Sequence, residues 1–111
     1  MSNVVYKIPC ANCDQHYVGQ TTTNLRQRVN LHKSHIRLRK ENCALAKHCI
    51  STGHNPDFGA IQVLDSEQNY RKRTILEMIR ISQDDTCMNS KKDIDALSSV
   101  HALGLNTSLS Q

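Results

Sequence analysis

Four side chains in the first half of the chain have the types and spacing of metal ligands. Cys10 and Cys13 form a Cys-x-x-Cys pair, and His48 and His54 follow as a pair of histidines. Thiolate and imidazole are ligands that zinc prefers, and a closed Cys₂His₂ set makes a structural site. The spacing departs from that of a short zinc finger, because 34 residues separate Cys13 from His48. The four residues therefore predict a structural zinc site of unusual layout.

Two other interpretations of these residues stay open. In the first, Cys10 and Cys13 are small packing residues and His54 is a loop histidine; within the zinc interpretation, Cys49 beside His48 is a substitute ligand. In the second, the cysteine pair is a redox centre. Redox Cys-x-x-Cys motifs favour a helix N-terminus, whereas this pair is expected in a hairpin turn.

Two tyrosines flank the cysteine pair. Tyr6 lies in the β-favouring run Val4–Ile8, and Tyr17 lies in the run His16–Val18. Enrichment in β-branched and aromatic residues, bounded by turn-forming residues, predicts that the two runs form a hairpin. If the register allows, the tyrosines come within side-chain reach of each other. They then either pack as a cross-strand aromatic pair or line a site.

The remaining elements that position these residues follow from periodicity and capping signals. Beyond the hairpin, the sequence predicts a helix from Leu25 to about Arg39, a short helix at Cys43–Ser51, a strand at Ala60–Leu64 and a helix at Asn69–Ser82. The main core stripe of the last helix is Ile75, Leu76 and Ile79. The expected fold class is α+β, with a small three-stranded antiparallel sheet flanked by helices. Residues 1–82 form one domain, and residues 83–111 are a weakly patterned extension of it.

The first predicted helix has faces of different character. When residues are placed at 100° steps around the helix axis, Leu25, Val29 and Ile36 form one apolar edge, and Leu31 with Leu38 form another. Between these edges lie Arg28, His35 and Arg39, with His32 on the first edge itself; one separate basic face holds Arg26, Lys33, Arg37 and Lys40. Burying polar groups without partners is costly. A cleft between this helix and the hairpin would give the polar residues a role.

The charge distribution points to a polyanionic partner. The net charge is +4, but residues 1–40 hold seven Lys and Arg against Asp14 alone, which gives +6, and the rest of the chain gives −2. A basic half of this kind suits a nucleic acid. No run of 18 apolar residues exists, so no membrane span is predicted, and no signal peptide is visible.

The two tripeptides Val4-Val5-Tyr6 and Tyr17-Val18-Gly19 resemble the paired triplets of the GIY-YIG nuclease family. The cysteine pair between them makes this stretch similar to the endonuclease domain of Penelope-like retroelements. The likeness has usable landmarks from Val4 to Ile81. It implies the same small α+β fold and a Cys-Cys-His-His zinc site of the layout described above.

The resemblance also implies a set of catalytic residues. Arg28 matches an arginine that contacts the scissile phosphate, with His32 one turn further on, and Glu77 matches the ligand of a single Mg²⁺ or Mn²⁺ ion. Tyr6 is the candidate general base or water-orienting group, with Tyr17 as its neighbour at the phosphate. Whether Tyr6 or His32 takes the proton stays open. Without the resemblance, Glu77 would be read as a helix ion pair with Arg73 at i,i+4.

Further expectations follow from the same likeness. Gly19 lets the backbone turn tightly beside the substrate, and Asn106 is the late asparagine that packs near the site. The leading hypothesis is a DNA endonuclease that nicks one strand and exposes a 3′-hydroxyl for target-primed reverse transcription. A reverse transcriptase domain in a parent protein and a nuclear location are then expected. The alternative hypothesis is a catalytically inactive, zinc-stabilised module that binds nucleic acid through the basic face.

Overall fold

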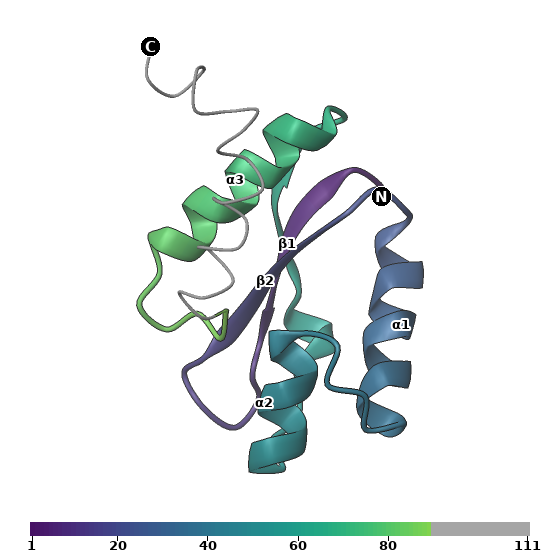
Figure 1. Ribbon diagram of the computed structural model, residues 1–111, viewed down its shortest axis with the longest axis vertical. Helices are drawn as coiled ribbons and strands as arrows, with labels where there is room; N and C mark the ends of the chain where they lie inside the picture. Colours follow the sequence, from purple (N-terminus) through teal and green to yellow (C-terminus); the bar gives the residue numbers. More distant parts are fainter. Residues whose placement is uncertain (90–111) are drawn as a thin grey trace.

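A three-stranded antiparallel sheet lies at the centre of the computed structural model, which describes residues 1–89 (Figure 1). The strands are β1 (Val4–Pro9), β2 (His16–Thr21) and β3 (Gln62–Ser66), in the spatial order β2-β1-β3. β1 and β2 form the predicted hairpin, in which Tyr6 pairs with Gly19. The predicted α+β class with a small antiparallel sheet is confirmed.

Helices cover both faces of this sheet. They are α1 (Leu25–Arg37), α2 (Ala44–Thr52) and α3 (Tyr70–Ser82). α1 and α2 pack against one face, whereas α3 packs against the other (Figure 1). The side chain of Asn24 caps α1 by accepting from the backbone N–H of Arg26, and Asn69 caps α3 by accepting from that of Lys72. Gly53 ends α2 with a left-handed φ of 75°, a conformation that favours glycine.

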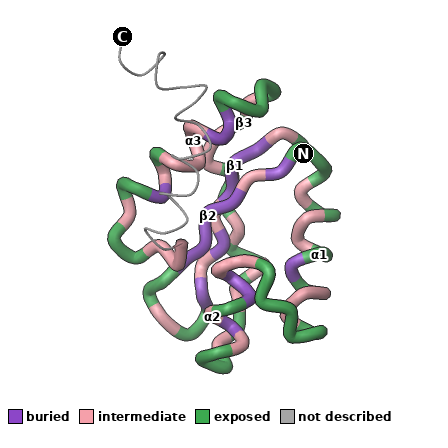
Figure 2. Tube along the Cα trace, in the orientation of Figure 1, coloured by how far each residue is buried: buried purple, intermediate pink, exposed green. Residues whose placement is uncertain are grey.

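The central strand β1 is buried on both of its faces. Val4, Val5, Tyr6 and Ile8 are each 0% exposed, and buried positions follow β1 and β2 in Figure 2. A strand with helices on both sides needs apolar side chains in both directions, which explains why β1 shows no alternation of apolar and polar residues.

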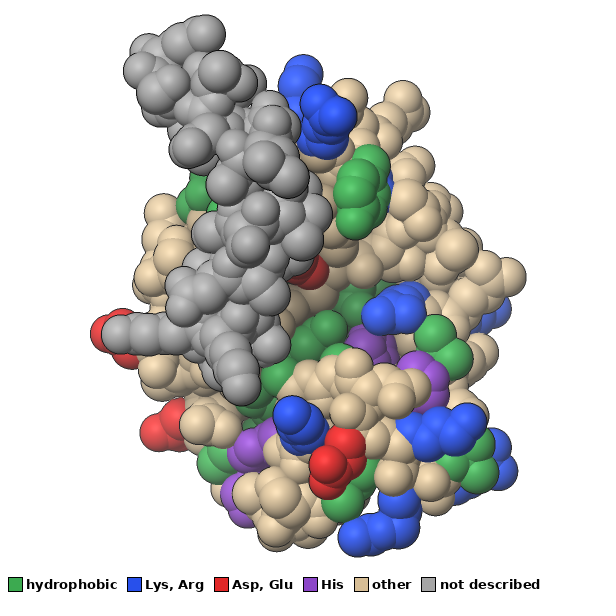
Figure 3. All heavy atoms as spheres, in the orientation of Figure 1, with side chains coloured by type: hydrophobic (Ala, Val, Ile, Leu, Met, Phe, Trp, Pro, Cys, Tyr) green, Lys and Arg blue, Asp and Glu red, His purple; other side chains and the backbone are tan. Residues whose placement is uncertain are grey.

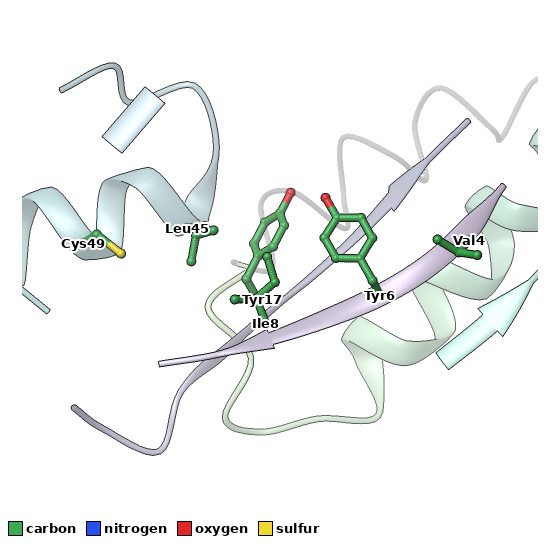
Figure 4. Packing of buried hydrophobic residues seen from close by; sticks show 6 residues of the cluster. All are labelled: Val4, Tyr6, Ile8, Tyr17, Leu45 and Cys49. Carbon is green, nitrogen blue, oxygen red and sulfur yellow. The ribbon is translucent and has the colours of Figure 1, made fainter. Parts of the chain in front are cut away.

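Two hydrophobic clusters fill the space between the sheet and its helices. The cluster under α1 and α2 contains Val4, Tyr6, Ile8, Tyr17, Leu45 and Cys49 (Figure 4). The cluster under α3 is centred on Val5, Val18 and Ile81. The prediction that Ile79 belongs to the core stripe of α3 is wrong, because Ile79 is 42% exposed and Ile81 takes the buried position.

Two further expectations are corrected. The predicted apolar edge of Leu31 and Leu38 is exposed, because α1 turns its other edge toward the sheet. β3 begins at Gln62 rather than at residue 60, because Phe58–Ala60 form a 3₁₀ turn in which Asp57 accepts from the N–H of Gly59.

The outer edge of β2 is covered by the segment that follows α3. The backbone N–H of His16 donates to the carbonyl of Thr86, and that of Met88 donates to the carbonyl of His16. The side chain of Asn89 then both accepts from Val18 N and donates to Val18 O, each at 3.1 Å. These bonds satisfy backbone groups that an edge strand otherwise leaves unpaired.

Candidate active site and metal centre

Tyr6 and Tyr17 stand side by side on the sheet face that α1 covers. Their ring centroids are 6.3 Å apart, and in Figure 4 both hydroxyls point away from the strands on the same side. The hairpin register causes this proximity, since Tyr17 pairs with Ile8, the residue two positions along β1 from Tyr6. The expectation that the tyrosines come within reach of each other is therefore confirmed.

His32 completes this aromatic group from α1. Its Nε2 lies 2.7 Å from the hydroxyl of Tyr6, and its ring is 5.4 Å from that of Tyr17. A neutral imidazole carries one proton, so the Tyr6 hydroxyl donates to Nε2 when the proton is on Nδ1, which lies 3.9 Å from Cys43 Sγ. His32 is only 2% exposed, and this bond explains a histidine on the apolar edge of α1.

The two partners of this hydrogen bond are both held in their neutral forms. Burial raises the pKa of Tyr6 to about 12, although the neighbouring Arg28 acts in the opposite direction. Burial, and then the positive charge of Arg28, lowers the pKa of His32 to about 4. The effect of burial on the pKa of Tyr6 is therefore larger than that of the neighbouring arginine.

Gly19 makes room for the Tyr6 hydroxyl. A Cβ atom at position 19 would lie 2.7 Å from that oxygen and 2.7 Å from Cε2 of Tyr17. Atoms this close overlap, so a side chain here requires one of the rings to move. Gly19 lies within β2 rather than in a turn, which differs from the expected reason for this glycine.

Arg28 and Glu77 approach the aromatic group from different helices. Arg28 on α1 is half-buried, and its guanidinium interacts with the Tyr6 hydroxyl. Glu77 on α3 is half-buried, and its negative charge contributes to raising the pKa of both Tyr6 and Tyr17. A carboxylate, a guanidinium and two phenols from four elements thus surround one region of the molecule. A hard carboxylate oxygen fits Mg²⁺, which takes one or two carboxylates and keeps several waters.

Arg73 has a structural environment that the sequence did not reveal. It is 0% exposed, and its guanidinium donates to the side chains of Gln20 and Asn3 and to the carbonyls of Glu67 and Gln68. Arg73 is therefore a buried residue rather than the exposed member of a surface pair. Arg73 instead ties the start of α3 to β2 and to the loop before α3.

The four predicted zinc ligands lie together at the tip of the hairpin. Their ligand atoms all fall within 4.8 Å of one another, with Cys10 Sγ 3.6 Å from His54 Nδ1 and Cys13 Sγ 3.5 Å from His48 Nε2. A tetrahedral zinc with usual bond lengths separates a sulfur from a nitrogen ligand by about 3.5 Å. The four residues therefore fit such an ion. Cys49 lies in the hydrophobic cluster under α2 and is not one of the four.

The predicted basic face lies away from the aromatic group. Arg26, Lys33 and Arg37 are exposed, and the ammonium of Lys33 lies 5.3 Å from the centre of the Phe58 ring. At 100° per residue, Arg26 and Arg28 point to nearly opposite sides of α1. Lys40 follows the end of α1 and is also exposed. Figure 3 shows Lys and Arg side chains at several separate places on the viewed face of the molecule.

Asn106, the predicted late asparagine, lies outside the described residues. Among residues 1–89, Asn89 is an asparagine that sequence reasoning missed, and it binds the backbone of Val18 next to Tyr17. Only its distance after α3 could have drawn attention to it, because a single asparagine in a weakly patterned segment carries no periodic signal.

Comparison with known proteins identifies the domain. The family model of the GIY-YIG catalytic domain matches residues 2–75, a range that contains Tyr6, Tyr17, Arg28 and His32, while Glu77 lies just beyond it. No curated protein and no solved structure matches the chain. No helix among residues 1–89 is long and apolar enough to cross a membrane. Because the match covers well over half of the 111 residues, the chain belongs to the GIY-YIG catalytic domain family, which implies nuclease activity.

Proposed function

We propose that this protein is a DNA endonuclease that nicks one strand by hydrolysing a phosphodiester bond. The observation that carries the proposal is the buried hydrogen bond between Tyr6 and His32, with Arg28 beside it. In this proposal the catalytic residues are Tyr6, Tyr17, Arg28, His32 and Glu77.

The tyrosine and histidine orient the attacking water. With the proton of His32 on Nδ1, the Tyr6 hydroxyl donates to Nε2, and lone pairs of its oxygen remain to accept a hydrogen bond from that water. The water oxygen forms a bond to phosphorus while the bond from phosphorus to the 3′-oxygen breaks, and the departing 3′-oxygen takes a proton from solvent, which leaves a 5′-phosphate and a 3′-hydroxyl. The water proton passes to the hydroxyl of Tyr6 as that hydroxyl passes its own to His32, so neither side chain needs to be charged beforehand.

Arg28 stabilises the negative charge that develops on the phosphate. Its guanidinium is a forked donor that matches phosphate oxygens, and its Nε is buried without a hydrogen-bond partner among residues 1–89. A cation in a partly desolvated place interacts with charge more strongly than one in water.

Glu77 is the proposed ligand of one Mg²⁺ or Mn²⁺ ion. Such an ion, when bound, withdraws charge from the phosphate oxygens as a Lewis acid. The half-buried position of Glu77 near both tyrosines supports this role.

The Cys₂His₂ cluster is the proposed structural zinc site. Cys10 and Cys13 come from the turn between β1 and β2, whereas His48 lies on α2 and His54 follows it. A closed set of four ligands leaves no position for a substrate, so its role is to hold the hairpin against α2. β1, which carries Tyr6, ends at this turn, and β2, which carries Tyr17, begins after it.

The wider context of the nuclease is also a proposal. The cysteine pair between the two strands, together with the clustered histidines, supports the endonuclease of a Penelope-like retroelement, which would work in the nucleus beside a reverse transcriptase domain. The nick would then supply the 3′-hydroxyl primer. We also propose that residues 83–111 extend the same domain, and the bonds of Thr86, Met88 and Asn89 to β2 support this.

A catalytically inactive, zinc-stabilised module that binds nucleic acid is the second candidate. One observation favours it, namely that the exposed cations Arg26, Lys33 and Arg37 lie on the opposite side of α1 from Arg28. Binding through this face would not need the residues around Tyr6.

Plasmid nicking separates the two candidates. Supercoiled plasmid incubated with the protein and Mg²⁺ or Mn²⁺ should yield open circles. The Glu77→Gln variant should nick slower by orders of magnitude yet bind DNA at least as well, because a negative charge near the phosphates is gone. Glu41→Gln, which removes an exposed carboxylate before α2, is the matched control and should nick normally. Full activity of Glu77→Gln would remove this residue from the site, and no nicking by the parent would favour the binding module.

A further inference from the structure

A pocket of about 540 Å³ opens between the loop after β2, α1 and the start of α3. Gln20 and Thr22 line it from the end of β2, Gln27 and Arg28 from α1, and Tyr70 and Arg73 from the first turns of α3. Arg28 belongs both to this pocket and to the surroundings of Tyr6. The pocket is therefore next to the candidate active site, and the proposed mechanism makes no use of it.

Tyr70 is the unusual member of this lining. It is 60% exposed, although a tyrosine ring is mostly apolar and gains by being covered. The ring lies over the guanidinium of Arg73, with 5.6 Å between its centroid and Cζ. Arg73 is itself fully buried and fixed by its hydrogen bonds, so the ring rests on a rigid support. The structure thus holds an aromatic face in place beside a pocket.

The rest of the lining is mostly polar and uncharged. The exposed side chains of Thr22 and Gln27 offer a hydroxyl and an amide, each of which donates and accepts hydrogen bonds. Apart from Arg28 and the buried Arg73, the lining residues among 1–89 carry no charged side chain. A planar ligand with mixed donors and acceptors around its edge suits such a place better than a phosphate does.

We infer that this pocket binds one unstacked nucleobase of the DNA substrate, with the base stacked on Tyr70 and its edge against Thr22 and Gln27. The inference rests on the proposed function, and it adds a substrate class to it: DNA with an unpaired nucleotide next to the cleaved bond. A base inside a duplex is already stacked on its neighbours, so it reaches a pocket only after leaving the helix, and an unpaired base leaves at the lowest cost. The shared residue Arg28 keeps this base adjacent to the scissile phosphate.

Binding to matched DNA hairpins tests the inference without requiring cleavage. One hairpin is fully paired, and the other carries a single bulged 2-aminopurine, whose fluorescence reports stacking. Both are titrated against Glu77→Gln protein, which removes nicking as a complication. The protein should prefer the bulged hairpin by about tenfold, as expected for one base stacked on an aromatic ring. Adding Tyr70→Ala should abolish this preference and leave affinity for the paired hairpin unchanged, while Tyr70→Phe should retain the preference.

Ile79→Ala is the control, since Ile79 is exposed on the same helix but does not line the pocket. If Tyr70→Ala keeps the same preference for the bulged hairpin as its parent, the pocket does not bind a base. A failed plasmid assay would overturn the proposed nuclease function, whereas the ratio of the two hairpin affinities is read from binding alone. The plasmid assay therefore tests the nuclease function, and the ratio of hairpin affinities tests the base-binding pocket.

Discussion

At the scale of single residues, the candidate site depends on free space around the Tyr6 hydroxyl. Gly19→Ala places a methyl group 2.7 Å from that oxygen, so Tyr6 must move and its 2.7 Å bond to His32 is disturbed. We expect nicking to fall by about a hundredfold, since misplacement of this order has that effect on catalysis. Overpacking should also lower the free energy of unfolding by about 1–3 kcal/mol. Nicking rates and denaturant unfolding on the same preparation measure both effects.

Gly59→Ala is the matched control for this substitution. Its Cβ would meet only Asp57 Oδ1, at 3.5 Å, which is an ordinary contact. Its activity and stability should stay close to those of the parent. Equal losses in both variants would show that the space around Tyr6 is not the cause.

His32 gives the protein a predictable response to acid. Its pKa is about 4 in the folded protein against 6.5 ordinarily, with Tyr6, Arg28, His35 and Cys43 around it. Between these values the unfolded chain binds a proton that the folded protein does not, so stability is lost as the pH falls through this window. From pH 7 to pH 5 this residue should account for about 2 kcal/mol of that loss.

Denaturant unfolding of the parent and of His32→Gln at pH 7 and pH 5 measures this contribution. The other histidines and the carboxylates titrate in both proteins, so their effects cancel when the two pH differences are subtracted. The variant should be less stable at pH 7 but should lose less on acidification. Identical losses would contradict a buried, neutral His32.

The types of the site residues could be recognised from the sequence, but their environments could not. Tyr6 and Tyr17 lie in recognisable tripeptides, and the four candidate zinc ligands form recognisable Cys and His pairs. The structure brings the members of each set together. The role of Gly19 and the directions of the pKa shifts depend on three-dimensional burial. Arg73 shows the same limit, because no local pattern distinguishes a fully buried arginine from an exposed one.

At the scale of elements, capping and helix-breaking residues predicted the ends of the helices better than hydrophobic periodicity predicted which side of each helix is buried. Asn24, Gly53 and Asn69 are local signals, and the helices begin or end beside them. The buried side of a helix depends on the angle at which it meets the sheet. For this reason Leu31 and Ile79 fit an apolar pattern yet are exposed.

The exposed cations of α1 carry a prediction at the same scale. Lys33 and Arg37 lie on one side of the helix, away from Arg28, so they suit contact with DNA backbone rather than chemistry. Replacing both with Gln should weaken binding about equally on unrelated duplexes, and the slope of log K against log salt should fall by about 1.8, or 0.9 for each contact.

Fluorescence anisotropy over a range of salt concentrations measures this slope, with Lys47→Gln on α2 as a control that removes one positive charge at another exposed site. Nicking at saturating DNA should be unchanged in the double variant. An unchanged slope would place the backbone contacts on another surface.

At the scale of the whole molecule, the catalytic strands depend on a small core. The two clusters contain few large aromatic side chains, and the hairpin tip projects beyond them toward α2. Besides the four candidate ligands, backbone hydrogen bonds such as Ala11 N–H to the carbonyl of Asn55 connect the tip with the loop after α2. Metal binding to such a cluster contributes directly to folding, because the unfolded chain offers no preformed site.

We therefore expect protein purified in metal-free buffer to carry about one zinc per chain, held at the Cys₂His₂ cluster. Cys13→Ser should lose the ion together with much of the folding free energy, since small domains of this size commonly depend on a metal or disulfides. Cys43→Ser removes a thiol outside the cluster and should keep the ion. Elemental analysis and melting curves of the three proteins provide the measurement. A parent that contains no zinc and still melts cooperatively at the same temperature after chelation would show that the hairpin holds its catalytic tyrosines without a metal.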